Sequence, residues 1–166
     1  MIAIRAMAVE DIDRILSLEA HTPEAPHWDC AAYERFLATP DTNDIRYAAL
    51  VAVHGHDLMG FAVARLVLDV CELESIVIAE NARRMGIGKA LLLAVATWGL
   101  GHGAVRMELE VRGSNENAIH FYEKRGLIKE GLRRGYYRDP TEDAVLMGKR
   151  LDSDLWTVEN FPQKTD

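Results

Sequence analysis

The sequence predicts a mixed, mostly antiparallel β-sheet flanked by helices, in the α/β (α+β) class. Segments 47–68 and 127–151 each hold two strand-like runs around a turn, which is the pattern of an antiparallel pair. Between them, segment 70–126 alternates strand, helix, strand and helix. A chain of 166 residues that is 49% hydrophobic can bury a sizeable core in one domain. We therefore expect a single domain over residues 1–151 and a tail over residues 152–166.

The N-terminal segment predicts a strand and two helices. Ile2 and Ile4 alternate as in a short strand. Apolar residues then recur at helical spacing among acidic residues of a first turn, namely Val9, Ile12, Ile15 and Leu16. Residues 21–28 contain two prolines and predict a loop, after which Asp29 is suited to cap a helix that reaches about Ala38.

A hairpin and a further strand follow. Runs 47–53 and 58–68 flank the turn residues His54-Gly55-His56-Asp57. No third metal ligand lies near the two histidines in the sequence, so we expect a solvated turn there. Residues 70–78 predict the next strand, in which Glu72 and Glu74 share a face that we expect to be solvated.

The second half of the predicted domain repeats a helix and a strand. Residues 86 to about 100 form a helical segment that is apolar around most of its girth, and we expect it to be largely buried. Its end is expected at the alternating glycines Gly99, Gly101 and Gly103. In the strand 105–111, Glu110 faces away from the apolar Met107, Leu109 and Val111.

The last helix and strand pair complete the predicted sheet. Ser114 or Asn115 can cap a helix that runs to about Arg125 and ends at Gly126. Residues 127–137 and 144–151 then predict an antiparallel pair around a turn at Asp139-Pro140.

Charge and composition exclude several classes of protein. A formal net charge of −7 opposes sequence-independent binding to nucleic acid and suits a cationic amine substrate. Cys30 and Cys71 are too few for a disulfide framework and indicate a reducing, cytoplasmic setting. The acidic residues at positions 10, 11 and 13 interrupt any secretory signal, and no apolar run approaches the length of a membrane span.

A basic loop with two glycines is the centre of the sequence. It joins the strand that ends near Ile78 to a helix start, and its basic residues are Arg83, Arg84 and Lys89. A helix N-terminus exposes about four unpaired N–H groups and carries roughly half a positive charge, which favours phosphate. Gly86 and Gly88 permit close approach of the backbone. The loop therefore predicts an anion cradle.

Two common phosphate-binding motifs do not fit this loop. The dinucleotide fingerprint needs a third glycine where Leu91 stands and a shorter spacing from the strand. The P-loop needs a glycine where Arg83 stands and Ser or Thr where Ala90 stands.

The hexapeptide Arg83-Arg84-Met85-Gly86-Ile87-Gly88 resembles the Arg/Gln-x-x-Gly-x-Gly/Ala pyrophosphate loop of the GCN5-related N-acetyltransferase (GNAT) superfamily. Three further stretches, Leu109-Glu110-Val111-Arg112 with Ser114-Asn115, Tyr122-Glu123-Lys124-Arg125-Gly126 and Arg133-Arg134-Gly135-Tyr136-Tyr137, resemble the ribosomal-protein alanine N-acetyltransferases. The resemblance covers about residues 58–151 closely and residues 1–57 loosely.

The resemblance implies a fold, a cosubstrate and site residues. It implies a sheet that splays between the strands ending at Ile78 and Val111, with acetyl-coenzyme A as cosubstrate and no metal. The implied coenzyme A contacts are the backbone of Ile76, Val77 and Ile78 for the pantetheine arm, Arg83, Arg84, Met85, Gly86, Ile87, Gly88 and Lys89 for the pyrophosphate, and Asn115 near the thioester. Glu110 would be the general base and Tyr122 the general acid. The acceptor would be a protein N-terminal α-amine, with alanine of a ribosomal protein favoured.

Alternatives remain open at this point. From strand alternation alone, Glu110 is more readily an exposed carboxylate than a base. The position of Tyr122 at the end of a helix favours a packing role for its ring. Asn115 is also suited to cap a helix. The chain departs from the family at Leu127, in a longer segment 21–28 beside the expected peptide groove, and in its tail. A small-amine or lysine acetyltransferase is an alternative, as is a non-catalytic acyl-coenzyme A sensor, which would need neither Glu110 nor Tyr122. The acceptor protein and the oligomeric state are not determined by the sequence.

Overall fold

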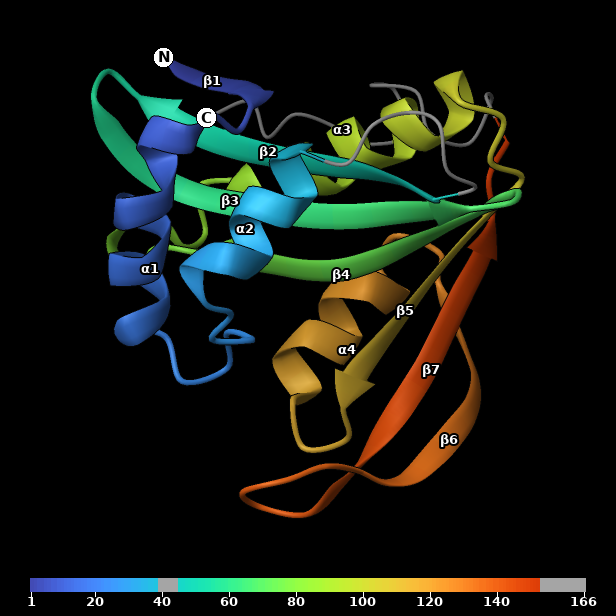
Figure 1. Ribbon diagram of the computed structural model, residues 1–166. Coiled ribbons are helices and arrows are strands. Elements are labelled where there is room, and N and C mark those ends of the chain that lie inside the picture. Colours follow the sequence, from blue (N-terminus) through green and yellow to red (C-terminus); the bar gives the residue numbers. More distant parts are fainter. Residues whose placement is uncertain (39–44, 153–166) are drawn as a thin grey trace.

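The protein folds around one seven-stranded sheet in the order β1-β2-β3-β4-β5-β7-β6 (Figure 1). The computed structural model describes residues 1–38 and 45–152. The strands are β1 (Ile2–Ala6), β2 (Ile45–His54), β3 (Asp57–Val67), β4 (Val70–Ile78), β5 (Arg106–Arg112), β6 (Ile128–Tyr137) and β7 (Glu142–Arg150). Every neighbouring pair is antiparallel except β4 and β5, which are parallel. The predicted mixed, mostly antiparallel sheet is confirmed.

Helices cover the two faces of this sheet. The helical segments are η1 (Val9–Asp11), α1 (Ile12–Ala20), α2 (Cys30–Ala38), η2 (Glu80–Ala82), α3 (Ile87–Gly101) and α4 (Glu116–Glu123). Ala62 and Ala64 of β3 pack in a cluster with α3, whereas Phe61 and Val63 pack in a second cluster with α1 and α2. In Figure 1, α1 and α2 lie in front of the first strands and α3 lies behind them. Because successive side chains of a strand point to opposite faces of the sheet, each strand contributes to two separate cores.

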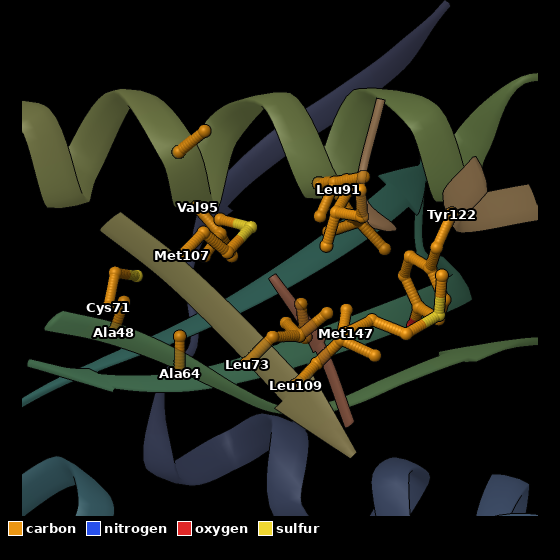
Figure 2. Close-up of a cluster of buried hydrophobic side chains, with 14 of the residues drawn as sticks. Ala48, Ala64, Cys71, Leu73, Leu91, Val95, Met107, Leu109, Tyr122 and Met147 are labelled. Atoms are coloured by element: carbon orange, nitrogen blue, oxygen red, sulfur yellow. The ribbon is translucent and has the colours of Figure 1, made fainter. Parts of the chain in front are cut away.

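The larger core lies between α3 and the middle of the sheet (Figure 2). Leu91 and Val95 of α3 and Met107 of β5 are fully buried in it, and Tyr122 of α4 lies at one end of the cluster. Burial of such side chains contributes about 1.5–3 kcal/mol each. The position of α3 in this core explains why residues 86–100 are apolar around most of the helix.

A fork opens between β4 and β5. Their parallel pairing runs from Val70 and Arg106 only as far as Leu73 and Leu109. Beyond that point β4 continues to pair with β3, and β5 continues to pair with β7. The two middle strands therefore diverge, as the resemblance implied.

A β-bulge in β4 lies at the start of the fork. Ser75 pairs with Val63 and Leu73 pairs with Ala64, so Glu74 has no opposite residue on β3. The extra residue reverses the alternation of the strand. Leu73 packs in the α3 cluster, whereas Val77 packs in the cluster of α1 and α2.

Most predicted element ends lie within about two residues of those in the structure, but the role given to the glycines of α3 needs correction. Gly99 and Gly101 do not end α3, because both lie within it and the chain turns at His102 and Gly103. Gly99 is buried there, and a Cβ at this position would lie 3.1 Å from the Cβ of Cys71, so the glycine allows close packing of α3 on β4. The regular part of α4 ends at Glu123, two residues earlier than expected.

Two remaining expectations concern the tail and the membrane. From residue 153 onward, the predicted tail lies outside the described residues. Among the helices that the structure describes, none has the length and apolar character needed to cross a bilayer.

Candidate active site

The first turn of α3 forms the predicted anion cradle. Gly86 precedes the helix with a φ of 79°, and Arg84 has a φ of 65°. Positive φ favours glycine and is uncommon for arginine. Alternating backbone conformations of this kind turn successive N–H groups toward one point, which suits an anion.

The N-terminus of α3 lacks the side-chain cap that two other helices have. Asp29 accepts a hydrogen bond from Ala32 N (2.8 Å) at α2, and Asn115 accepts one from Ala118 N (3.1 Å) at α4. In the described chain, no side chain performs this role at the 15-residue helix α3. Its first N–H groups are therefore available to an anion such as a phosphate group.

The other cradle residues differ in what they offer. Arg83, Arg84 and Met85 are exposed, whereas Ile87 is buried in the core and can contribute only its backbone. A Cβ on Gly88 would lie 3.4 Å from the ring of Phe121 on α4. The cradle is thus in close contact with α4 as well as with its own helix.

Glu110 lies at the fork, one residue beyond the last residue of β5 that pairs with β4. Leu109 and Val111 pack toward α3, so Glu110 points to the opposite face of the sheet. Its Oε1 lies 3.0 Å from the Nε of Arg133 on β6, and its side chain is 26% exposed. Interaction with the Glu110 carboxylate raises the pKa of Tyr136. Glu110 is therefore a structured, partly buried carboxylate.

A second carboxylate shares this region. Glu74, the bulged residue of β4, has its Oε1 2.9 Å from the Nε of Arg65, which also pairs with Glu72 at 2.5 Å. Burial raises the pKa of Glu74, and the charges of Glu72 and Glu110 act in the same direction. The expected solvated face is thus an ion-paired cluster beside Glu110.

Tyr122 approaches the fork from the other face. Its side chain is buried in the α3 cluster together with Leu73 and Leu109, which form the last residue pair between β4 and β5. Burial raises the pKa of Tyr122 above its usual value. The phenol is therefore fully protonated at neutral pH, as a proton donor must be.

Asn115 is the N-cap of α4, so one of its two sequence interpretations is confirmed. Its loop is attached to β7, because Glu142 Oε1 accepts a hydrogen bond from Ser114 N at 2.5 Å. The contact of Asn115 with a thioester stays a prediction. Ile76, Val77 and Ile78 lie on the part of β4 beyond the pairing with β5, and their contact with a pantetheine arm also stays a prediction.

The sequence interpretation assigned no role to Arg133 or Tyr136. Both lie in the quoted Arg-Arg-Gly-Tyr-Tyr stretch, but their approach to Glu110 depends on the way β6 and β7 extend the sheet. Among the described residues, no group of three His, Cys, Asp or Glu side chains could hold a metal ion.

Comparison with known proteins identifies relatives of this arrangement. The sequence model of the Acetyltransferase (GNAT) family matches residues 12–127. The [ribosomal protein bS18]-alanine N-acetyltransferase of Haemophilus influenzae is 31% identical over 140 residues, which cover 82% of this chain and 90% of the relative. The ribosomal-protein-S18-alanine N-acetyltransferase of Escherichia coli has a similar crystal structure, with a TM-score of 0.79, 27% identity and coverage of 92% and 95% of the two chains. Arabidopsis thaliana NAA60 in complex with acetyl-CoA shares the fold, with a TM-score of 0.80 at 19% identity and coverage of 91% and 99%.

Proposed function

The chain belongs to the acetyltransferase (GNAT) family, and we propose on this basis that it acetylates a protein N-terminal α-amine, with the terminal alanine of ribosomal protein bS18 as the favoured acceptor. It is an acyltransferase, as its family and its relatives are. The acceptor is inferred from the activity for which those relatives are named. The proposed reaction takes place in the cytoplasm.

The observation that carries the proposal is the placement of Glu110 and Tyr122 on opposite faces of the β4–β5 fork. A cosubstrate that lies in the fork would have a proton donor on the α3 side. An amine that approaches from the other face would meet a carboxylate. A sensor of acyl-coenzyme A would need the cradle but neither proton-transfer group.

Each site residue has a distinct role in this proposal. Acetyl-coenzyme A supplies an activated acetyl group as a thioester. The cradle at residues 83–89 binds its pyrophosphate, and the free edge of residues 76–78 pairs with the pantetheine arm. Glu110 accepts the proton of the amine, directly or through one water, as the new C–N bond forms. Tyr122 donates a hydrogen bond or a proton to the sulfur as the C–S bond breaks.

The proton balance favours an α-amine over lysine. An α-amino group with a pKa near 7.7–8.0 is roughly one-tenth neutral at pH 7, whereas lysine near 10.4 is neutral in about one molecule in 2,500. Only the neutral amine is a nucleophile. The acidic surroundings of Glu110, Glu74 and Glu72 also suit a cationic acceptor terminus.

A peptide with an N-terminal alanine and an internal lysine tests the proposal. After incubation with acetyl-coenzyme A, fragment-ion mass spectrometry should place the acetyl group on the α-amine. A matched peptide with a blocked terminus should remain unmodified. Exclusive acetylation of the lysine, or binding of acetyl-coenzyme A without transfer to any acceptor in a panel of peptides that differ in their first residue, would overturn it.

A further inference from the structure

Arg125 follows the C-terminal end of α4 and lies close to the anion cradle, from which one aromatic ring separates it. Its guanidinium carbon is 3.6 Å from the centre of the Phe121 ring, and its Nη1 donates a hydrogen bond to Phe121 O at 2.6 Å. The same ring would be 3.4 Å from a Cβ on Gly88, in the first turn of α3. One aromatic ring therefore separates the guanidinium from the cradle.

The charge of Arg125 is poorly compensated within the protein. Its Nε is buried and has no hydrogen-bond acceptor in the described part of the chain, and no carboxylate of that part forms an ion pair with it. Burial lowers the pKa of the Arg125 side chain. Guanidinium groups inside proteins are usually paired with carboxylates or phosphates, because an unpaired buried cation is costly.

Lys89 adds a second cation at the same place. It is the third residue of α3, and its pKa is lowered by burial and by the charge of Arg125. Two cations that repel each other thus converge on a helix N-terminus that already favours negative charge. A chain that needed only to pack α4 against α3 would be more stable with an apolar side chain over Phe121.

We propose that Arg125 is an additional contact for the pyrophosphate of coenzyme A, which reaches the cradle from the C-terminal end of α4 across Phe121. This inference rests on the acetyl-coenzyme A use proposed above, but it does not depend on the acceptor. Pyrophosphate is favoured over the 3′-phosphate of the same molecule because the Phe121 ring, on which Arg125 stacks, lies against Gly88 of the cradle. Planar guanidinium groups bind phosphate oxygens in pairs, which is a stronger contact than packing alone.

Calorimetric titration with coenzyme A tests the proposal without any acceptor. Arg125→Met retains an unbranched side chain over the Phe121 ring and removes the charge. We expect its Kd for coenzyme A to rise about tenfold or more, which corresponds to the loss of one charge-assisted hydrogen bond. Lys129→Met is the matched control, because Lys129 carries the same charge nearby and pairs with Glu123 at 3.4 Å. Its Kd should remain within about twofold of the unaltered value.

Two further measurements separate the possible causes. Titration with 3′-dephospho-coenzyme A should show the same fold-loss for Arg125→Met, since the pyrophosphate is retained. In the absence of ligand, the Tm of Arg125→Met should be unchanged or higher, because a partly buried charge without an ion-pair partner among the described residues has been removed. Arg125→Lys should bind coenzyme A with intermediate affinity.

Several outcomes would overturn the inference. The first is an unchanged Kd for coenzyme A in Arg125→Met. The second is a loss of affinity that disappears when 3′-dephospho-coenzyme A is used. The third is a loss of affinity that is accompanied by a lower Tm of the ligand-free variant. If the unaltered protein binds no coenzyme A, the proposed function fails as well. If the unaltered protein binds coenzyme A and Arg125→Met binds it as tightly as the control Lys129→Met does, the inference alone fails.

Discussion

Arg133 Nε lies 3.0 Å from Glu110 Oε1, so the carboxylate proposed to accept the substrate proton is already paired with a cation. The pair is weak, because 57% of the Arg133 side chain is exposed and such pairs contribute about 0–1 kcal/mol. An incoming ammonium group can therefore replace Arg133 at modest cost.

The Arg133 pair predicts a competition with the acceptor. Arg133→Met should lower KM for a peptide acceptor by up to about fivefold, since the carboxylate no longer has to exchange one cation for another. Arg134→Met removes the same charge from the next position of β6 and should leave KM within about twofold. Steady-state kinetics at low ionic strength measure both variants. An increase in KM for Arg133→Met would instead make Arg133 a peptide-binding residue.

Glu110→Gln should reduce kcat/KM, and the deficit should depend on pH. The amide keeps the shape of the side chain but cannot accept the proton, and positioned proton transfer is worth about 10² to 10⁴ in rate. As pH rises past the pKa of the amine, more acceptor is already neutral, so the deficit should shrink. Glu108→Gln, on the same face of β5 and paired with Arg106, is the control. A deficit that is constant from pH 6 to 9 would argue against a general base.

Tyr122→Phe should lower kcat with little change in the Kd for coenzyme A. The ring still fills its place in the α3 cluster, and only the hydroxyl is lost. The raised pKa of Tyr122 makes it a weak proton donor to a thiolate whose conjugate thiol has a pKa of about 8.5. Positioned proton transfer contributes about 10² to 10⁴ in rate, and we expect the fall in kcat to lie in the lower part of this range. Single-turnover kinetics measure the chemical step. Unchanged turnover would reduce Tyr122 to a packing residue.

Gly86→Val should weaken coenzyme A binding without a clash inside the protein. No described atom lies within 4 Å of a Cβ at this position, but valine strongly disfavours the φ of 79° that the cradle uses. Gly55→Val is the matched control, because Gly55 has a φ of 60° and open space in the distant β2–β3 turn. Both variants should lose about 1–3 kcal/mol of stability. Only Gly86→Val should lose affinity in calorimetry.

Asp11→Asn should destabilise the protein at neutral pH but much less at low pH. The Asp11 carboxylate is buried, and Arg5 and Arg14 bind it at 2.6 and 2.7 Å. The hydrogen bond from Arg5 lowers the pKa of Asp11 to about 2. Because the folded pKa is depressed, this stability, about 2 kcal/mol, is present above pH about 4 and is lost as pH falls toward 2.

Urea unfolding as a function of pH measures this effect. The difference between the unaltered protein and Asp11→Asn should be constant from pH 5 to 7 and should close below pH 4. Asp13→Asn removes an exposed carboxylate from the first turn of α1, the helix that follows Asp11, and should change stability by less than about 0.5 kcal/mol. An equal loss in both variants would show that Asp11 has no special role.

Local features of the chain were predictable because they depend on residues a few positions apart. Asp29 and Asn115 cap their helices through hydrogen bonds to the third residue that follows, so sequence spacing is sufficient to predict them. The alternation of Leu109, Glu110 and Val111 likewise follows from strand geometry. Gly99 was misinterpreted because its effect depends on Cys71, a residue of another layer.

The sequence by itself determined the order of strands and helices, the basic glycine loop and the candidate acid and base. The tertiary structure decided where the sheet opens, since the fork exists only because β4 keeps its pairing with β3 while β5 keeps its pairing with β7. It also decided which groups meet, bringing Arg133 to Glu110, and bringing the Phe121 ring, on which Arg125 stacks, to Gly88 of the cradle. These contacts depend on strand register and on the packing of helices on two faces, and neither is specified by the spacing of residues along the chain.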